Sequence, residues 1–213
     1  MSKIKIPNYS LGEEIFNSIS HGIGAGLSIS ALVLMVVKGH TALQEVTVSL
    51  FGATMIILYT ISCVYHALSK NLTGKKVLRV IDHCNVFLLV FGTYIPVVLL
   101  GVGGAFGWTL FGLICAVTLL GITLTAINID RFQVAGTLCH LISGWSILIA
   151  IPVLVQSMGW GGLLFLILGG VAYSLGALLY ALGSKIKYMH CIFHIFCLAG
   201  TILHFFAIYL FLL

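Results

Sequence analysis

Apolar runs of about 20 residues, separated by short charged or glycine-rich stretches, fill almost the whole chain. Runs of this length match helices that cross a bilayer, and they lack the strict alternation of barrel strands. Backbone groups in lipid must also find hydrogen-bond partners within their own segment, which favours helices. The pattern predicts seven spans, at approximately 15–37, 46–68, 79–101, 105–127, 133–155, 160–183 and 188–211.

Composition supports the same class of protein. Of the 213 residues, 61% are hydrophobic and only 7% are charged, which lies far outside the range of soluble domains. We therefore expect an all-α integral membrane bundle that forms one transmembrane domain over residues 1–213. The polar start "MSKIKIPNYSLGEE" precedes a long span and contains no cleavage site of a signal peptide, so the first helix is expected to be retained.

The distribution of basic residues predicts the orientation. With these spans, only Lys38 among the ten basic residues falls on one side of the membrane. The other nine are Lys3, Lys5, Lys70, Lys75, Lys76, Arg79, Arg131, Lys185 and Lys187. Because basic residues are enriched on the cytoplasmic side, the amino terminus is predicted inside and the carboxyl terminus outside. The net charge of +5 then reflects topology and lipid head groups, so membrane lipids are the expected partners and nucleic acid is not.

The cysteines do not suggest a disulfide framework. All six lie in or beside the predicted spans, and none lies in an outward loop where an oxidising environment would pair them. They are expected to be small buried apolar residues.

Polar residues within the spans gather near the predicted cytoplasmic side. They are Glu14, Asn17, His21, Ser62, His66, Asp82, His83, Asn85, His140, His190 and His194. Polar groups in lipid are costly and tend to face a bundle interior or a site. Of the eight histidines, only His40 and His204 fall outside this layer.

Helical spacing indicates which of these side chains can meet. His190 and His194 are four residues apart and share one face of a helix, as do Ser62 and His66. A His-x-x-x-His pair can present two imidazoles to one zinc ion, but Cys191 replaces the glutamate of the soluble metalloproteases, which excludes that class. A zinc site would need a third ligand from another helix. Without one, the pair would be hydrogen-bonded across helices or would reach water at the interface.

The segments "EEIFNSISHGIGA", "SCVYHAL", "VLRVIDHCNVFLLVFGTYIPV" and "YMHCIFHIFCLAGTILH" resemble the hemolysin III proteins, the bacterial branch of the progestin and adipoQ receptor family. The family pattern is present as Glu14, Asn17, His21, Ser62, His66, Asp82, His190 and His194. The resemblance implies a seven-helix bundle in the bacterial plasma membrane. It also implies a Zn²⁺ ion near the cytoplasmic face, held by His66, His190 and His194, with Asp82 near the zinc through a water.

Three protein ligands and an open position are typical of catalytic zinc. Asp82 is then the candidate base, and Ser62 the candidate residue that orients the ring or the water. His21 and His140 are expected to be hydrogen-bond partners, and Cys63 is a possible competing ligand.

Three functions remain open. The first is a zinc-dependent hydrolase of a lipid amide or ester at the cytoplasmic leaflet. The second is a regulator of membrane lipid state with a structural zinc. A pore-forming cytolysin ranks last, because a bundle this hydrophobic has no soluble form and lacks a polar stripe through the whole bilayer.

Overall fold

The computed structural model describes residues 4–183 and 186–213, and these residues are helical with no strand. The α-helices are α1 (Leu11–Lys38), α2 (Ala42–Ala67), α3 (Thr73–Pro96), α4 (Gly104–Asn128), α5 (Gln133–Trp145), α6 (Ile151–Gly183) and α7 (Met189–Phe211). A π-helical segment, Val97–Val102, continues α3, and a 3₁₀ segment, Ser146–Ala150, joins α5 to α6. The all-α prediction is confirmed for this part of the chain.

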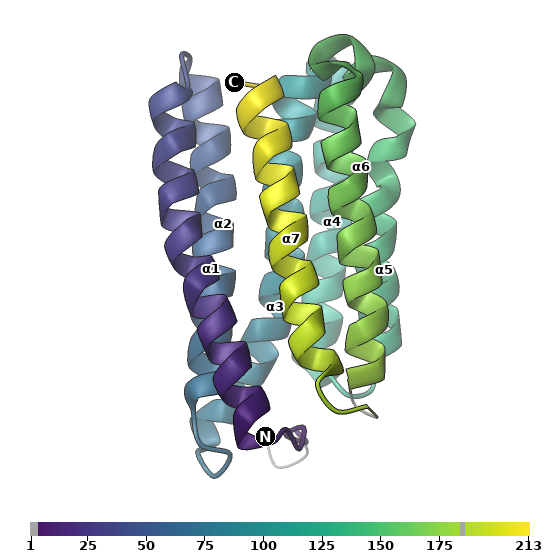
Figure 1. Ribbon diagram of the computed structural model, residues 1–213. Coiled ribbons are helices and arrows are strands. Elements are labelled where there is room, and N and C mark those ends of the chain that lie inside the picture. The colour runs from purple at the N-terminus through teal and green to yellow at the C-terminus, as the bar shows by residue number, and fades with distance from the viewer. Residues whose placement is uncertain (1–3, 184–185) are drawn as a thin grey trace.

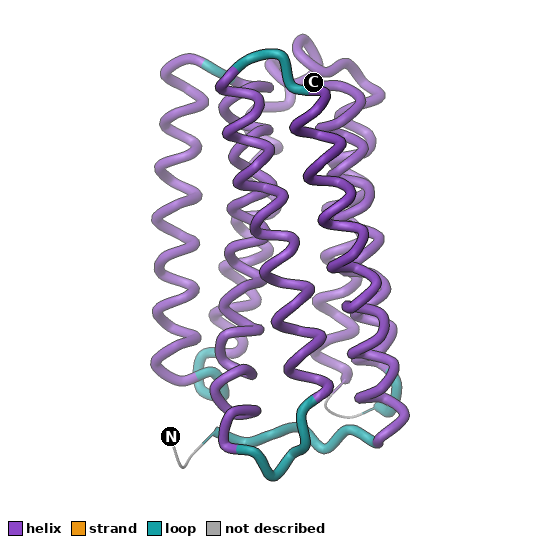
Figure 2. The backbone as a smooth tube through the Cα atoms, turned by 90° about the vertical axis from the view of Figure 1, so that its left-hand side faces the viewer, coloured by secondary structure: helices purple, strands orange, loops and turns teal. Residues whose placement is uncertain are grey.

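The helices run side by side along one long axis, with the connecting loops at the two ends (Figures 1 and 2). α1 and α2 form a pair that packs through α2 on α3 and through α1 on α7, while α6 packs along α7. Figure 1 shows that α1 begins at one end of the bundle and α7 finishes at the other. We call the end where α1 begins the N-terminal end.

Within residues 4–183 and 186–213, six helical stretches are long and apolar enough to cross a membrane: Leu11–Lys38, Ala42–Ala67, Thr73–Val102, Gly104–Asn128, Gln133–Gly183 and Met189–Phe211. The predicted spans 133–155 and 160–183 both fall within the fifth stretch, which is 51 residues long. Its helical geometry is interrupted at Gly159, whose φ of 65° and ψ of 176° are not helical. The predicted count of seven crossings stays a prediction.

Several helices begin earlier than their apolar runs do. α1 begins at Leu11 because Ser10 caps it: the Ser10 hydroxyl accepts from the Glu13 amide, and the Glu13 carboxylate accepts from the Ser10 amide at 2.8 Å. Polar capping residues lie outside a hydrophobic window, so the window misses them. The capping box brings Glu13 and Glu14 into the first turn of α1.

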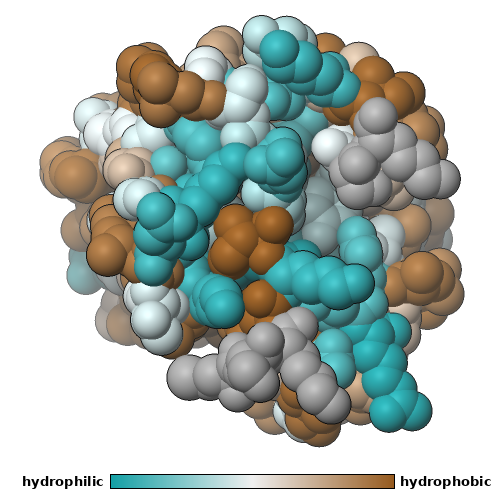
Figure 3. Space-filling view, turned by 90° about the horizontal axis from the view of Figure 1, so that it is seen from below, coloured by the Kyte–Doolittle hydropathy of each residue, from teal (hydrophilic) through white to brown (hydrophobic). Residues whose placement is uncertain are grey.

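The exterior of the bundle is apolar along its sides and polar at the N-terminal end. Exposed leucines, isoleucines and valines occur on the outward faces of the helices, among them Ile23, Val33, Leu119, Ile149 and Leu178. Figure 3 shows hydrophilic side chains over much of the N-terminal end. Lys3 and Lys185, two of the basic residues predicted on the cytoplasmic side, lie outside the described residues.

Candidate metal centre

Three histidines from two helices converge inside the N-terminal end of the bundle. His66 lies in the last turn of α2, and His190 and His194 lie in the first two turns of α7. All three are buried, with exposed fractions of 2%, 5% and 1% respectively. One nitrogen of each ring lies within 4.8 Å of the nitrogens of the others, so the group can hold a metal ion. The structure thus brings together the three histidines that the family resemblance named.

The two histidines of α7 have the nitrogen spacing of a tetrahedral ion, whereas nitrogens within the whole group lie up to 4.8 Å apart. Zinc–nitrogen distances of about 2.0–2.1 Å place two ligand nitrogens about 3.3 Å apart. The Nε2 atoms of His190 and His194 are 3.2 Å apart. Nε2 of His66 is buried and has no hydrogen-bond partner among the described residues. A buried nitrogen without a partner is costly, and a metal ion would satisfy its lone pair.

The other nitrogen of the His66 ring is held by a carboxylate from α1. Nδ1 of His66 lies 2.7 Å from Oε2 of Glu14. A carboxylate only accepts, so Nδ1 carries the proton of this hydrogen bond and Nε2 is the nitrogen left to face an ion. The second Glu14 oxygen, Oε1, accepts from Nζ of Lys75 at 2.6 Å. Sequence reasoning gave Glu14 no role and counted Lys75 only as a cytoplasmic charge.

The first turn of α7, which carries His190, is fixed by a backbone contact. The preceding residue, Tyr188, has φ 64° and is the one non-glycine residue with positive φ in the described ranges. Its amide donates to Oε1 of Glu13 at 2.8 Å. The left-handed conformation costs a side-chain-bearing residue about 1–2 kcal/mol, which this contact helps to offset. The capping box of α1 therefore also sets where α7 begins.

Asp82 lies on α3 beside the histidines without joining them. No carboxylate belongs to the convergent group within residues 4–183 and 186–213. Ser62 and His66 both lie close enough to Asp82 to interact with its carboxylate. Oδ2 of Asp82 is 3.8 Å from Nδ1 of the adjacent His83. Asp82 and Ser62 are thus neighbours of the group, and their chemical roles stay predictions.

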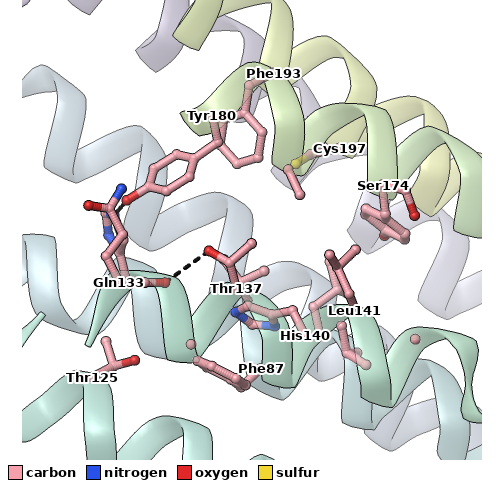
Figure 4. Close-up of a pocket in the computed structure, with 18 of the residues that line it drawn as sticks. Phe87, Thr125, Gln133, Thr137, His140, Leu141, Ser174, Tyr180, Phe193 and Cys197 are labelled. Carbon is pink, nitrogen blue, oxygen red and sulfur yellow. Dashed lines mark hydrogen bonds between the residues drawn. The ribbon is translucent and has the colours of Figure 1, made fainter. Parts of the chain in front are cut away.

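A cavity of about 160 Å³ borders the histidine group at His190. Asp82 and His190 line its inner end, and the lining continues to Trp145 and His204 further along the bundle. Figure 4 shows Tyr180, Phe193 and Cys197 facing Thr137 and His140 of α5 across this space. The lining is mainly apolar and aromatic, which suits a hydrocarbon chain.

Two histidines expected as hydrogen-bond partners make ring contacts in the structure. The His21 ring stacks on His194 with 3.7 Å between centroids, and neither of its nitrogens has a hydrogen-bond partner among the residues described. The His140 ring stacks on Phe87 at 3.5 Å, and its Nδ1 is likewise unpartnered there. Cys63 does not belong to the convergent group. Its Sγ is 3.5 Å from the Ser18 hydroxyl.

The segment before α1 covers the histidine group from the N-terminal end. We call residues 5–10 the N-terminal strap. The Tyr9 ring stacks on His190, with 4.7 Å between ring centroids and 17° between planes. Burial raises the pKa of the Tyr9 hydroxyl well above its usual range, so the ring stays neutral. Lys70 fixes the segment by donating to the Asn8 side chain at 2.8 Å and to the Tyr9 carbonyl at 2.5 Å.

A second anchor holds the beginning of the strap. Nη1 of Arg79 donates to the Lys5 carbonyl at 2.6 Å and to the Asp130 carboxylate at 2.9 Å. The Lys5 amide also donates to Asp130 at 3.4 Å. The strap is therefore tied to α3 and to the α4–α5 loop. No pattern in the sequence indicates the strap, because a polar terminus before an apolar run is expected to lie in solvent.

These features define the class of protein: a multi-pass membrane protein built from long apolar helices, with a candidate metal centre buried at one end. The family model described as Haemolysin-III related matches residues 9–205, and the chain belongs to that family. It is thus a multi-pass bacterial membrane protein, as the resemblance indicated.

Relatives with similar sequences agree with this placement. Hemolysin-3 of Bacillus cereus is 37% identical over 204 residues, which cover 94% of this chain and 92% of the relative. The Hemolysin-3 homolog of Bacillus subtilis (strain 168) is 36% identical over 203 residues, 94% of each chain. The Adiponectin receptor protein of Drosophila melanogaster is 24% identical over 231 residues, 92% of this chain and 50% of the relative. This distant similarity fits the progestin and adipoQ receptor family.

Proposed function

We propose that this protein is a zinc-dependent hydrolase that cleaves an amide or ester bond of a membrane lipid at the cytoplasmic leaflet. The observation that carries the proposal is the buried three-histidine group, one member of which, His190, lines a mainly apolar cavity together with the Asp82 carboxylate. His66, His190 and His194 would hold the ion. When bound, zinc supplies a Lewis acid and a more acidic water.

The protein's own residues supply proton transfer and substrate positioning. Asp82 lines the cavity next to His190, where its carboxylate can accept a proton from the attacking water and return it to the leaving group. The Ser62 hydroxyl, which lies close to that carboxylate, would hold it in place. The apolar lining excludes water and would accept the acyl chain of the lipid, so its scissile bond would lie at the inner end. Membrane lipids are then both surroundings and substrate.

The location at the cytoplasmic leaflet depends on the topology that we propose, with seven crossings and the amino terminus inside. α1 begins at the end opposite to where α7 finishes, which supports an odd number of crossings (Figure 1). A continuous 51-residue helix would be about 76 Å long, more than twice a hydrocarbon core of about 30 Å. The break at Gly159 divides that stretch into two segments that each have the length of one crossing.

The test measures zinc and turnover in the same preparations. Purified protein should contain about one zinc per chain and release fatty acid from a ceramide or a phospholipid in bilayers. Asp82→Asn should keep the zinc and lose roughly 10²–10⁴-fold in turnover, because it preserves shape and removes the base. Zinc-loaded protein that releases no more fatty acid than His190→Ala, across a panel of ceramides and phospholipids, would refute hydrolysis of these lipids.

A second function is favoured by the strap. Tyr9 stacks directly on His190, and all three histidines are buried, as expected for a structural ion. In that case the protein would be a non-enzymatic regulator of membrane lipid state. Asp82→Asn would then change thermal stability with no turnover to lose, which separates the two functions.

A further inference from the structure

We propose that Lys75 is a positioning residue of the metal centre, which sets the orientation of His66 through two contacts at once. The proposal rests on the metal-binding part of the proposed function and is independent of hydrolysis. Lys75 lies in the first turn of α3, on a different helix from each of the three histidines.

The first contact reaches the His66 side chain through Glu14. Nζ of Lys75 donates to Oε1 of Glu14 at 2.6 Å, and Oε2 of the same carboxylate accepts from Nδ1 of His66 at 2.7 Å. With both oxygens bound, the carboxylate cannot rotate without losing a charge-assisted hydrogen bond. Its fixed position keeps the proton on Nδ1 of His66 and directs Nε2 toward His190 and His194.

The second contact reaches the backbone of α2 next to His66. Nζ of Lys75 also donates to the Leu68 carbonyl at 2.8 Å. Leu68 caps α2, two residues after His66, where helix carbonyls have no partner within the helix. The ammonium group lies 5.1 Å from the centre of the Tyr65 ring as well, in a cation–π contact. Lys75 therefore holds the end of α2 and the carboxylate that orients its ligand.

The burial of Lys75 shows that the positive-inside bias alone does not explain a lysine at this position. Lys75 has an exposed fraction of 0%, whereas a positive charge that only marks the cytoplasmic side can stay in water. Removing an ammonium group from water is costly and is repaid only by close, well-oriented partners. The partners here are the carboxylate, the carbonyl and the ring around His66.

The test compares Lys75→Met with Lys76→Met in the full-length protein, purified in lipid nanodiscs. Lys76 is the next residue of α3, and its side chain points about 100° away around the helix. Competition with a zinc chelator should show that Lys75→Met and Glu14→Gln each bind zinc about 10–100-fold more weakly than the wild type. Lys76→Met should bind as the wild type does. The double variant should bind zinc more tightly than the product of the two single losses predicts, because the two residues share the contact with His66 through Glu14 and only the Leu68 contact of Lys75 is separate.

A spectroscopic measurement separates positioning from general loss of structure. Co²⁺ bound in place of zinc gives visible absorption bands that depend on ligand geometry. These bands should change in Lys75→Met and Glu14→Gln and stay unchanged in Lys76→Met. If wild-type protein binds zinc while Lys75→Met matches it in affinity and Co²⁺ spectrum, the role of Lys75 is refuted. Wild-type protein that binds no zinc refutes the metal centre itself.

If Lys75→Met does not fold, the zinc affinity and the Co²⁺ spectrum of Glu14→Gln test the proposal instead. Unchanged zinc affinity and an unchanged Co²⁺ spectrum in that variant would refute the chain of contacts from Lys75 through Glu14. A weaker site with altered bands would support it.

Discussion

At the scale of single residues, the candidate site divides into groups that would bind an ion and groups that orient them. His66, His190 and His194 each bring one nitrogen within 4.8 Å of the others, which makes them the candidate ligands. His204 lies on the same helix as His190, but its Nε2 donates to the Leu166 carbonyl at 3.1 Å, away from the group. Burial in α7 alone therefore does not make a histidine a ligand.

This difference predicts the zinc content of two alanine variants. His190→Ala should lose most of the bound zinc, because the two remaining histidines leave the site short of protein ligands. His204→Ala should retain about one zinc per chain, since His204 is not part of the group. Elemental analysis of the purified proteins measures both. Equal zinc contents would show that the ion, if present, lies elsewhere.

The sequence was sufficient to place His190 and His194 on one helical face, because that relation depends only on spacing. It required the family resemblance to add His66, since no local pattern reports which helices are neighbours. The contacts of Lys75 could not be predicted. A lysine near a membrane boundary satisfies the positive-inside bias whether it is exposed or buried, so the sequence cannot separate these cases.

At the scale of helices, the sequence predicts that a helix is present more reliably than it predicts the residues at which the helix begins. Each apolar run corresponds to a helical stretch, because burial of long apolar segments in lipid leaves the backbone few alternatives. The starts of α1, α2 and α3 come earlier than predicted, at Leu11, Ala42 and Thr73. Polar residues there extend a helix without adding hydrophobicity, as Ser10 and Glu13 do for α1.

The break at Gly159 leads to a prediction about topology. In a variant without the native cysteines, Trp160→Cys should react with a membrane-impermeant maleimide in intact spheroplasts. Trp160 is 72% exposed beside the break, at the end predicted to lie outside. Asn71→Cys, in the loop between α2 and α3, should react only after permeabilisation. Labelling of both sites from the same side would contradict seven crossings, and the reverse pattern would invert the orientation.

At the scale of the whole molecule, the strap links the chain's beginning to its last helix. Tyr9 covers His190, and Lys70 and Arg79 hold the strap in place. An ion entering or leaving from the N-terminal end must pass this segment. The strap therefore governs access to the site from that side.

This cover predicts a kinetic effect on metal loss. A chelator should strip zinc about 2–10-fold faster from Tyr9→Ala than from wild type, since an aromatic stacking contact contributes about 0.5–1.5 kcal/mol. Tyr209→Ala is the matched control, because Tyr209 contacts Lys38 near the opposite end of α7. Stopped-flow measurement with a zinc-sensitive dye gives both rates. Identical rates for the two variants would mean that the strap does not limit metal exchange.

The origin of the three histidines on α2 and α7 has a consequence for biosynthesis. About 120 residues separate His66 from His190, and a ribosome needs about 6–25 seconds to add them. Throughout that interval Glu14, Lys75 and His66 can already be in the membrane, whereas their partner ligands do not yet exist. A chain that stalls before α7 offers one histidine to a metal ion instead of three. If the three histidines bind an ion, stable metal capture is thereby confined to chains whose translation and membrane insertion have reached the final helix.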